Sequence, residues 1–395
     1  MEATAVQMDS TNAASREDAV LAPVYGHLPF VPQRAAGCDI FTEDGRRILD
    51  LYGGHAVAAL GYAHPALVNA ISEQSQRLLF QSNAVALDVR ARATEKLLSV
   101  APAGLTRAFF VNSGAEANEN ALRIAFMATG RSKVLAITHG FHGRTAAAAA
   151  VTWNAANRWY GFPHLPFDVE FIPRDDVTAA REMITSDVAA VIFEPVQGIA
   201  GAYDLNIEFV EALRERTSVT GTVLIADEVQ SGMGRSGRFF ASEAYGIQPD
   251  IVTNAKSLGG GMPCGAVMMT EALGTALHAG DLGSTFGGGP VAAAAILAVI
   301  DTIQQENLLD NVRQREAQIR EQCATGPVKR VRGMGMLLGL VCDRPAREVR
   351  DLLLEQDILT GLSSDPDILR LLPPLILQPA QVDRLTAELA RIPPV

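Results

Sequence analysis

Short apolar runs alternate with amphipathic stretches along the middle of this chain. Between positions 106 and 255 the apolar runs are AFFV, KVLAI, VEFI, AAVIF, VLIA and DIVTNA, and helix-patterned stretches separate them. Strands that are apolar throughout and alternate with helices are typical of a parallel sheet with right-handed crossovers. The pattern therefore predicts an α/β fold with a mostly parallel sheet.

The C-terminal part of the chain has a different pattern. A helical pattern runs from Pro290 to about Cys323, and RVRGMGMLLGLVC, AREVRDLLLEQ, ILRLLPPLIL and AQVDRLTAELARI then predict strand, helix, strand and helix, a smaller α+β domain. Near the start, IFTEDGRRILDLY predicts a hairpin around Asp44-Gly45 that joins this smaller unit. We expect a flexible lead-in over 1–20, a joining segment over 21–50, a large domain over 51–290 and a small domain over 291–395.

Composition narrows the class of protein. The chain has 395 residues, enough for two or three structural units, and a formal net charge of −11 with no basic stretch, which argues against nucleic-acid binding. The longest apolar run, near 291–300, is about half the ~20 residues that span a bilayer, and the first residues lack the pattern of a signal peptide. The cysteines stand singly, which favours reduced thiols over disulfides or a zinc site: Cys38, Cys264, Cys323 and Cys342. We expect a cytoplasmic enzyme without a metal.

Polar side chains follow several of the predicted strands. In open α/β sheets, ligands bind beyond the carboxyl ends of the strands. The residues at those ends are Asn112, Glu194, Asp227 and Lys256. After Asn112, Ser113-Gly114 opens a helix, either as a plain capping box with Glu116 or as an anion site at a helix N-terminus. Phosphate is the anion that such a site would take.

Asp227 and Lys256 each pose a question. Asp227 ends an apolar strand, and neither lysine nor arginine follows before Arg235, so its partner comes from elsewhere in the chain or is not protein. Lys256 is one of only four lysines among 33 basic residues, and it precedes three glycines. It either buries its stem at a strand end or offers a primary amine for a Schiff base, which an arginine cannot form.

One cofactor would use all these groups together. Pyridoxal phosphate carries a phosphate for the helix start, an aldehyde for Lys256 and a basic ring nitrogen for Asp227. An acid that faces the ring nitrogen keeps it protonated, so the ring can accept electrons.

The motifs then resemble a known family. NSGAEANE, FHGRT, FEPVQG, DEVQSGMGRSG, AKSLGGGMPCGAV and GSTFGGGP occur in the order found in class III (subgroup II) pyridoxal-phosphate aminotransferases, the acetylornithine, ornithine and 4-aminobutyrate group. The match runs from about Tyr25 to Pro374. The resemblance implies fold type I, like aspartate aminotransferase, and a homodimer with shared active sites.

The resemblance also assigns roles to individual residues. Lys256 and Asp227 match the Schiff-base lysine, which also moves the proton, and the acid at the ring nitrogen. Other positions match cofactor contacts: Ser113, Gly114 and Ala115 at the phosphate, Phe141, His142, Glu194, Val229 and Gln230 around the ring, and Ser284 and Thr285 at the partner subunit's phosphate. Tyr25 and Arg144 match the pair that holds a distal substrate carboxylate, and Arg370 matches the arginine for the α-carboxylate.

Three positions depart from the family pattern. Ile199 stands where a glutamate usually neutralises the arginine matched by Arg370. His55 stands where ornithine transaminases have tyrosine and acetylornithine transaminases an aliphatic residue, and it either contacts substrate or is a packed polar residue. Gly289 replaces a common asparagine, a change without an interpretation.

The expected activity follows from this resemblance. We expect a ping-pong aminotransferase that passes an amino group from an ornithine-like, acetylornithine-like or related ω-amino donor to 2-oxoglutarate, with α- or β-amino donors admitted because of Ile199. The alternatives are a decarboxylase or aminomutase of the same family, or a phosphate- or nucleotide-binding protein without catalysis.

Overall fold

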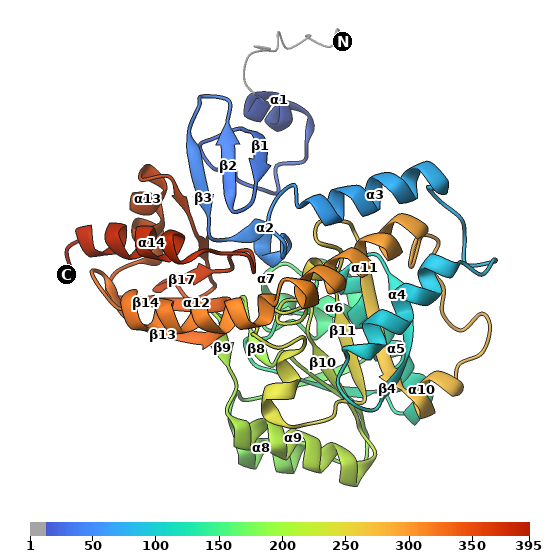
Figure 1. The fold of residues 1–395 in the computed structure, drawn as a ribbon. Helices are drawn as coiled ribbons and strands as arrows, with labels where there is room; N and C mark the ends of the chain where they lie inside the picture. The colour runs from blue at the N-terminus through green and yellow to red at the C-terminus, as the bar shows by residue number, and fades with distance from the viewer. Residues whose placement is uncertain (1–12) are drawn as a thin grey trace, which may run out of the picture.

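The computed structural model describes residues 13–395, and its centre is a seven-stranded sheet (Figure 1). The strands lie in the order β4 (Leu105–Val111), β12 (Gly265–Thr270), β11 (Ile251–Asn254), β10 (Val223–Asp227), β7 (Val188–Phe193), β5 (Lys133–Ile137) and β6 (Asp168–Ile172). β12 pairs antiparallel with both neighbours, and the remaining pairs are parallel. The predicted mostly parallel α/β fold is confirmed, and β12 is the strand that the sequence pattern missed.

The central strands are apolar because both of their faces are covered. Every residue of β7 and β10 is buried. Alternate residues of β10 enter two different cores: Val223 and Ile225 pack with helix α5 (Gly114–Thr129), and Leu224 and Ala226 pack in the larger core on the other face. Burial on both faces fixes the strand, so its last residue, Asp227, has a fixed position at the sheet edge.

Two smaller sheets contain the N-terminal and C-terminal strands. One has the order β1 (Pro32–Ala36), β2 (Asp39–Thr42), β3 (Arg47–Asp50) and β15 (Ile358–Leu359); the other has β13 (Val328–Met334), β14 (Leu337–Cys342), β17 (Ile368–Leu371) and β16 (Gly361–Leu362). The hairpin around Asp44-Gly45 is confirmed, and β3 pairs parallel with β15. The N-terminal hairpin thus lies beside C-terminal elements, as expected.

The prediction of one strand over RVRGMGMLLGLVC is wrong. The chain reverses there, and β13 and β14 pair antiparallel. Gly335 makes the reversal possible: its φ is +60°, and a Cβ at this position would lie 2.4 Å from the Arg235 carbonyl oxygen. ILRLLPPLIL forms a strand only over β17, because Pro373 and Pro374 have no N–H for a ladder.

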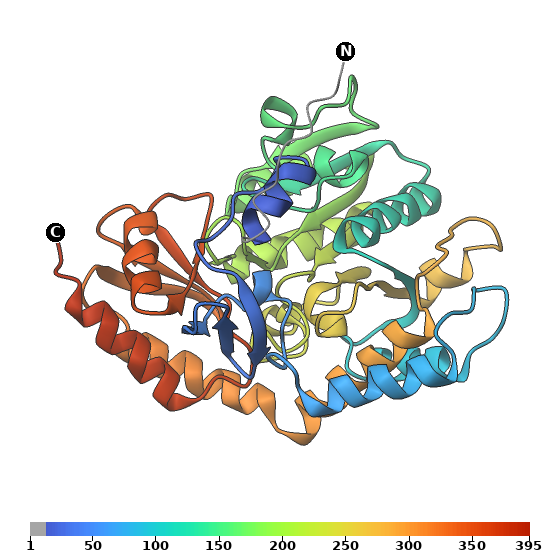
Figure 2. The ribbon, with the colours of Figure 1, turned by 90° about the horizontal axis from the view of Figure 1, so that it is seen from above.

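The helical pattern after Pro290 divides into two helices. α11 (Pro290–Gln305) ends before Asn307, whose φ is +51°, and α12 (Leu308–Gln322) follows. α11 packs against α3 (Pro65–Arg77) and α4 (Asp88–Ser99), whereas α12 packs against α14 (Pro379–Arg391), as Figure 2 shows. We propose the expected large and small domains with α11 as the helix that connects them.

The N-terminal segment contains a helix where the sequence predicts a flexible lead-in. Residues 13–20 form α1 (Ala13–Val20), and residues 1–12 of that predicted lead-in lie outside the described residues. Glu17 and Asp18 place carboxylate oxygens 4.0 and 3.0 Å from the His27 ring nitrogens, which ties α1 to the following segment. Within residues 13–395, the helices are all too short or too polar to cross a membrane.

The segment α2 (Gly53–Ala56) is a left-handed turn. Its φ angles are +55°, +57°, +63° and +64°. Left-handed backbone costs about 1–2 kcal/mol per residue with a side chain, so His55 and Ala56 store strain that the surrounding structure holds. The Ser257 hydroxyl donates to the Ala56 carbonyl oxygen at 2.8 Å, which joins this turn to the segment of Lys256.

Two glycines of this turn give a matched test of the strain. We expect Gly54→Ala to lower the free energy of unfolding by about 1–2 kcal/mol, because a Cβ there has nothing within 4 Å and only the backbone conformation costs energy. Gly53→Ala should cost at least about 1 kcal/mol more, because its Cβ would lie 2.7 Å from the Leu372 carbonyl oxygen. Denaturant unfolding measures both values, and equal losses would contradict the close packing of this turn.

Candidate active site

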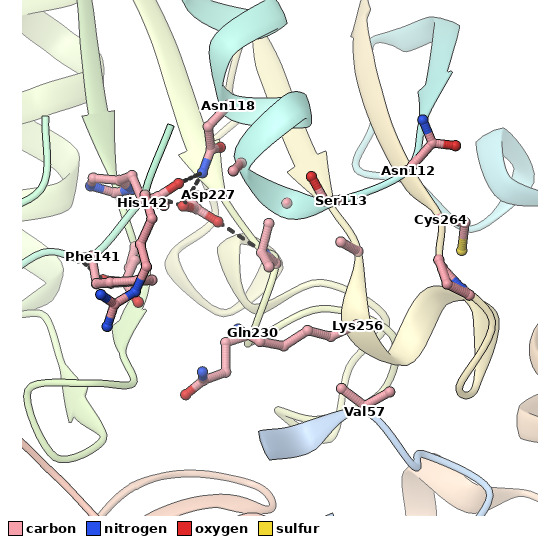
Figure 3. A pocket seen from close by; sticks show the side chains of 18 of the residues that line it. Val57, Asn112, Ser113, Asn118, Phe141, His142, Asp227, Gln230, Lys256 and Cys264 are labelled. Atoms are coloured by element: carbon pink, nitrogen blue, oxygen red, sulfur yellow. Dashed lines mark hydrogen bonds and ion pairs between the residues drawn. The ribbon is translucent and has the colours of Figure 1, made fainter. Parts of the chain in front are cut away.

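One cavity of about 440 Å³ lies at the carboxyl ends of β4, β7 and β10 (Figure 3). The start of α5 and the segment around Lys256 complete its wall. The sequence-predicted residues that line it are Ser113, Gly114, Ala115, Phe141, His142, Arg144, Glu194, Ile199, Asp227, Val229, Gln230 and Lys256. The structure therefore brings together most of the residues singled out from the motifs.

The other predicted residues lie outside the wall of this cavity. Arg370 is directly behind it, with Nη1 3.5 Å from the Gln230 Oε1. The Ser284 hydroxyl accepts a hydrogen bond from the Asn112 side chain at 3.2 Å. Thr285 is exposed, and Tyr25 is 84 % exposed, so a single chain does not bring these two side chains to the cavity. His55 is exposed beside Tyr52.

The N-terminus of α5 presents backbone N–H groups to the cavity. Ser113 is the N-cap, and its hydroxyl accepts from the Glu116 N–H at 3.2 Å. Glu116 in turn accepts from the Asn112 N–H at 2.9 Å, one residue earlier than in a standard capping box. A Cβ on Gly114 would lie 2.7 Å from Val229 Cγ1, so the close approach of these two segments requires glycine.

Asp227 has partners from distant parts of the chain. Its Oδ2 accepts from Asn118 Nδ2 and lies at the same 2.7 Å distance from His142 Nδ1, while its Oδ1 accepts from the Val229 N–H at 3.0 Å. Asn118 is held in turn, because its Oδ1 accepts from the Thr253 hydroxyl at 2.7 Å. Figure 3 shows Asn118 and His142 beside Asp227 at one side of the cavity. The carboxylate is thus fixed in position without an ion pair to lysine or arginine among the described residues.

Sequence reasoning missed Asn118 and Thr253. Asn118 is four residues after Gly114, which places it on the same face of α5, and it stands among alanines and a leucine of the buried face. A buried amide on an apolar helix face needs hydrogen-bond partners, and this was the available signal. Thr253 lies inside β11 and gave no comparable signal.

Glu228 explains why two acids follow one another at the end of β10. Its carboxylate points away from the cavity wall and accepts from the Ala241 and Ser242 N–H groups, each at 2.7 Å, and from the Ser231 hydroxyl at 2.8 Å. Burial raises the pKa of Glu228, and these donors oppose that rise. The first acid faces the cavity, and the second holds together the loop that follows.

Glu194 is a further buried acid in the cavity wall. It accepts from the Phe141 N–H at 2.8 Å and the Gly198 N–H at 3.2 Å. Burial raises the pKa of Glu194 to about 7; His142 opposes the rise and the nearby Asp227 charge adds to it. The oxygens of Glu194 fix two backbone segments of the cavity wall.

Lys256 places a primary amine inside the cavity. Its backbone φ is +44°, and its Nζ has neither a hydrogen bond nor an ion pair within residues 13–395. Burial lowers the pKa of Lys256, although Asp227 and Glu194 act in the opposite direction. A lowered pKa increases the neutral fraction of the amine, which is the form that attacks carbonyl groups and accepts protons.

Comparisons with known proteins agree on one family. Residues 20–392 match the family model described as Aminotransferase class-III. The chain is 41 % identical over 377 residues to an acetylornithine aminotransferase of Streptomyces coelicolor, with 94 % of this chain and 92 % of that protein covered. It is 40 % identical over 370 residues to an acetylornithine aminotransferase of Methanopyrus kandleri, with 93 % and 95 % covered.

Solved structures give the same result for the fold. An ornithine aminotransferase of Toxoplasma gondii, with partial occupancy of PLP at its active site, matches with a TM-score of 0.89 and 27 % identity, covering 97 % of this chain and 95 % of that one. An acetylornithine aminotransferase of Elizabethkingia anophelis matches with a TM-score of 0.84 and 26 % identity, covering 96 % and 97 %.

The consecutive acids allow a direct test of the structural role of Glu228. We expect Glu228→Gln to lower the free energy of unfolding by about 2–4 kcal/mol, because an amide NH₂ would face N–H donors in a buried site. Glu243→Gln is the control, since that exposed residue accepts from one backbone N–H at 3.1 Å and should change stability by less than about 1 kcal/mol. Equal stability of the two variants in urea unfolding would show that the contacts of Glu228 are dispensable.

Proposed function

The chain belongs to the class-III aminotransferases, which depend on pyridoxal phosphate, and on that premise we propose that it transfers an amino group from an amino-acid donor to 2-oxoglutarate in a ping-pong reaction. The observation that carries the proposal is the arrangement of one cavity, where the N-terminus of α5, the carboxylate of Asp227 and the amine of Lys256 face the same space. The names of the relatives favour donors related to ornithine or acetylornithine. Ile199, which stands where the family usually has glutamate, favours α- or β-amino acids as donors.

The residues present fit this cofactor. The backbone of Ser113, Gly114 and Ala115 would hold the phosphate at a helix N-terminus, where N–H groups and the helix dipole favour an anion. Asp227 offers a negative charge that no described lysine or arginine neutralises, as a pyridinium requires, and Lys256 offers the free amine that would hold the aldehyde carbon. Further contacts in the proposal are Phe141, His142, Glu194, Val229 and Gln230 around the ring.

When bound, pyridoxal phosphate supplies an aldehyde that exchanges amines and a ring that accepts the electron pair left on carbon. The protein supplies the proton transfers. The Lys256 Nζ would take the proton from the amino-bearing carbon of the substrate and release it again, for which its lowered pKa suits it. Asp227, fixed by Asn118 and His142, would keep the ring nitrogen protonated.

Two arginines offer sites for substrate carboxylates. Arg144 lies in the cavity wall, with its guanidinium 4.8 Å from the Trp159 ring centroid. Arg370 is buried, without a salt bridge to any described acid. Because each carboxylate of a dicarboxylate such as 2-oxoglutarate can pair with one guanidinium, one arginine in the cavity wall and another directly behind it support the proposed acceptor. Tyr25 is exposed outside the cavity of its own chain, so its proposed contact with the distal carboxylate requires its segment to reach the cavity.

The proposal includes a homodimer with shared active sites. Phe80 and Phe286 are 42 % and 64 % exposed, and their ring centroids lie 5.2 Å apart. Thr285, adjacent to Phe286, is exposed outside the cavity of its own chain, which fits a role with Ser284 at the phosphate of the partner subunit. Light scattering should give twice the mass of one chain, and a monomer with full activity would refute shared sites.

Purified protein and a panel of amino donors test the activity itself. Each donor is incubated with 2-oxoglutarate, and glutamate formation is measured. Glutamate that appears only with an amino donor supports the proposal. If no donor gives glutamate while carbon dioxide or an isomerised amino acid is released, the chain is a decarboxylase or an aminomutase of the same family.

Asp227→Asn tests the charge at the ring nitrogen. We expect the variant to be less stable, because its amide NH₂ would face N–H donors, but to fold and bind the cofactor and to lose about two orders of magnitude or more in turnover. Visible absorbance verifies cofactor binding, and steady-state assays give the rate. An unchanged rate would mean that Asp227 serves only to organise the end of the strand.

Ile199→Glu tests the donor preference. Within residues 13–395, Arg370 is not paired with an acid, so the α-carboxylate of a donor can dock on it directly. A glutamate at position 199 would compete for this guanidinium. We expect about a tenfold or larger fall in kcat/KM for α-amino donors relative to ω-amino donors, since one charge-assisted pair is exchanged for another.

Ile199→Gln is the control for size without charge, and it should shift the preference far less. The same ratio of efficiencies in wild type and Ile199→Glu would contradict a role for position 199 in donor choice.

A further inference from the structure

Arg370 is anchored by neutral oxygen atoms. Its Nε donates to the Leu362 carbonyl oxygen at 2.7 Å, its Nη1 to the Gly198 carbonyl oxygen at 3.3 Å, and its Nη2 to the Tyr52 hydroxyl at 2.7 Å. The residue is 3 % exposed. Carbonyl and phenol oxygens accept from the guanidinium but leave its positive charge uncompensated and do not use all five of its N–H groups, so the buried guanidinium keeps its attraction for an anion.

The Tyr52 hydroxyl has a fixed direction. A guanidinium can only donate, so the Tyr52 oxygen accepts from Arg370, and its own proton points elsewhere. The His55 Nδ1 lies 2.9 Å from the same oxygen. We assign the Tyr52 proton to His55 Nδ1, one of the two arrangements that this distance allows, which places the His55 proton on Nε2. The hydrogen bonds run in one direction, from Arg370 to Tyr52 to His55.

His55 is held at the outer end of this chain by the left-handed turn. Its φ is +63°, and its ring centroid lies 4.7 Å from that of Tyr52. Although the residue is exposed to solvent, partial desolvation of its ring beside Tyr52 lowers the pKa of His55, and the positive charges of Arg370 and Lys256 lower it further. These two cations and Tyr52 are the titratable groups that face the ring. His55 is thus a neutral acceptor in the absence of a bound carboxylate.

We propose that Tyr52 and His55 form a relay that keeps Arg370 open to a substrate carboxylate and then adds a third hydrogen bond to it. The relay rests on the proposed function, because it requires a carboxylate substrate. When the carboxylate meets Arg370, the Tyr52 hydroxyl turns its proton from His55 to a carboxylate oxygen. Tyr52 is then a specificity residue for the α-carboxylate of amino and oxo acids. His55 is a positioning residue, because it accepts the hydroxyl proton of Tyr52 and so orients that hydroxyl until a carboxylate binds.

The relay couples carboxylate binding to protonation of His55. A bound carboxylate offsets the charge of Arg370, which raises the pKa of His55. A protonated His55 carries N–H at Nδ1 and no longer accepts from Tyr52, so the hydroxyl donates to the carboxylate instead. Binding should therefore take up a fraction of a proton when the pH is close to or slightly below the usual histidine pKa of about 6.5.

Calorimetry of glutarate binding tests the relay. Glutarate has the five carbons and two carboxylates of 2-oxoglutarate but no carbonyl group, so it binds to the cofactor-loaded enzyme without reacting. Titrations at pH 6.5 in two buffers of different ionisation enthalpy give both the affinity and the proton uptake. We expect Tyr52→Phe to weaken binding about tenfold, and His55→Asn to weaken binding a few-fold and to abolish the uptake.

Two matched variants provide controls. Tyr245→Phe removes a phenol that donates to the Pro195 carbonyl oxygen at 2.8 Å, and His64→Asn removes a histidine whose Nε2 lies 3.2 Å from Glu306. Both should bind glutarate with wild-type affinity and proton uptake.

Three results would overturn the relay: wild-type affinity in Tyr52→Phe, proton uptake that persists in His55→Asn, or no glutarate binding by the wild type. His55→Asn keeps the test decisive if Tyr52→Phe fails to fold, because His55 is exposed. The experiments distinguish failure of the relay from failure of the proposed function. A protein that binds glutarate through Tyr52 but transfers no amino group would contradict only the proposed function. An active transaminase whose glutarate binding does not depend on Tyr52 would contradict only the relay.

Discussion

The burial of Asp227 is the constraint on which the site depends. A carboxylate at the end of a strand that is covered on both faces is stable only if donors meet it or a cation neutralises it. The chain supplies donors from α5, from the His142 segment and from the Val229 N–H, and it supplies no lysine or arginine as an ion-pair partner among the described residues. These donors fix the direction of the carboxylate, and its charge remains available to a cofactor cation.

The positive groups of the site are kept apart from that charge. Lys256 and Arg370 are both buried, and burial lowers the pKa of each. Neither forms an ion pair with a described acid, so the site contains a fixed carboxylate, a buried amine and a buried guanidinium that are held by the fold. This arrangement is costly for a folded chain alone, and a cofactor with a phosphate, a ring nitrogen and an aldehyde, followed by carboxylate substrates, would satisfy each group.

The sequence predicted the parts of this arrangement that depend on local pattern. Asn112, Glu194 and Asp227 could be placed because apolar runs end on them, and parallel strands bring such ends to one edge. The turn at Gly335 could not be predicted, because its reason is the close approach of Arg235, about a hundred residues away in sequence.

The role of Tyr52 was hidden for the same kind of reason. It is separated from Arg370 by 318 positions, and no local pattern marks a phenol as the partner of a distant guanidinium. Asn118 is an intermediate case. The sequence shows an amide on an apolar helix face, which predicts that it needs a hydrogen-bond partner, but it does not show that the partner is Asp227. Local periodicity thus fixes which residues reach the edge of the sheet, and tertiary contacts decide which of them are paired.

The central claim is that the amine of Lys256 holds the cofactor at the site organised by Asp227. The most direct measurement is reduction of the purified, yellow protein with borohydride, followed by proteolysis and mass spectrometry of the peptides. The account predicts bleaching of the colour and a pyridoxyl group on the peptide that contains Lys256. A pyridoxyl group on Lys96, Lys133 or Lys329 instead would contradict it.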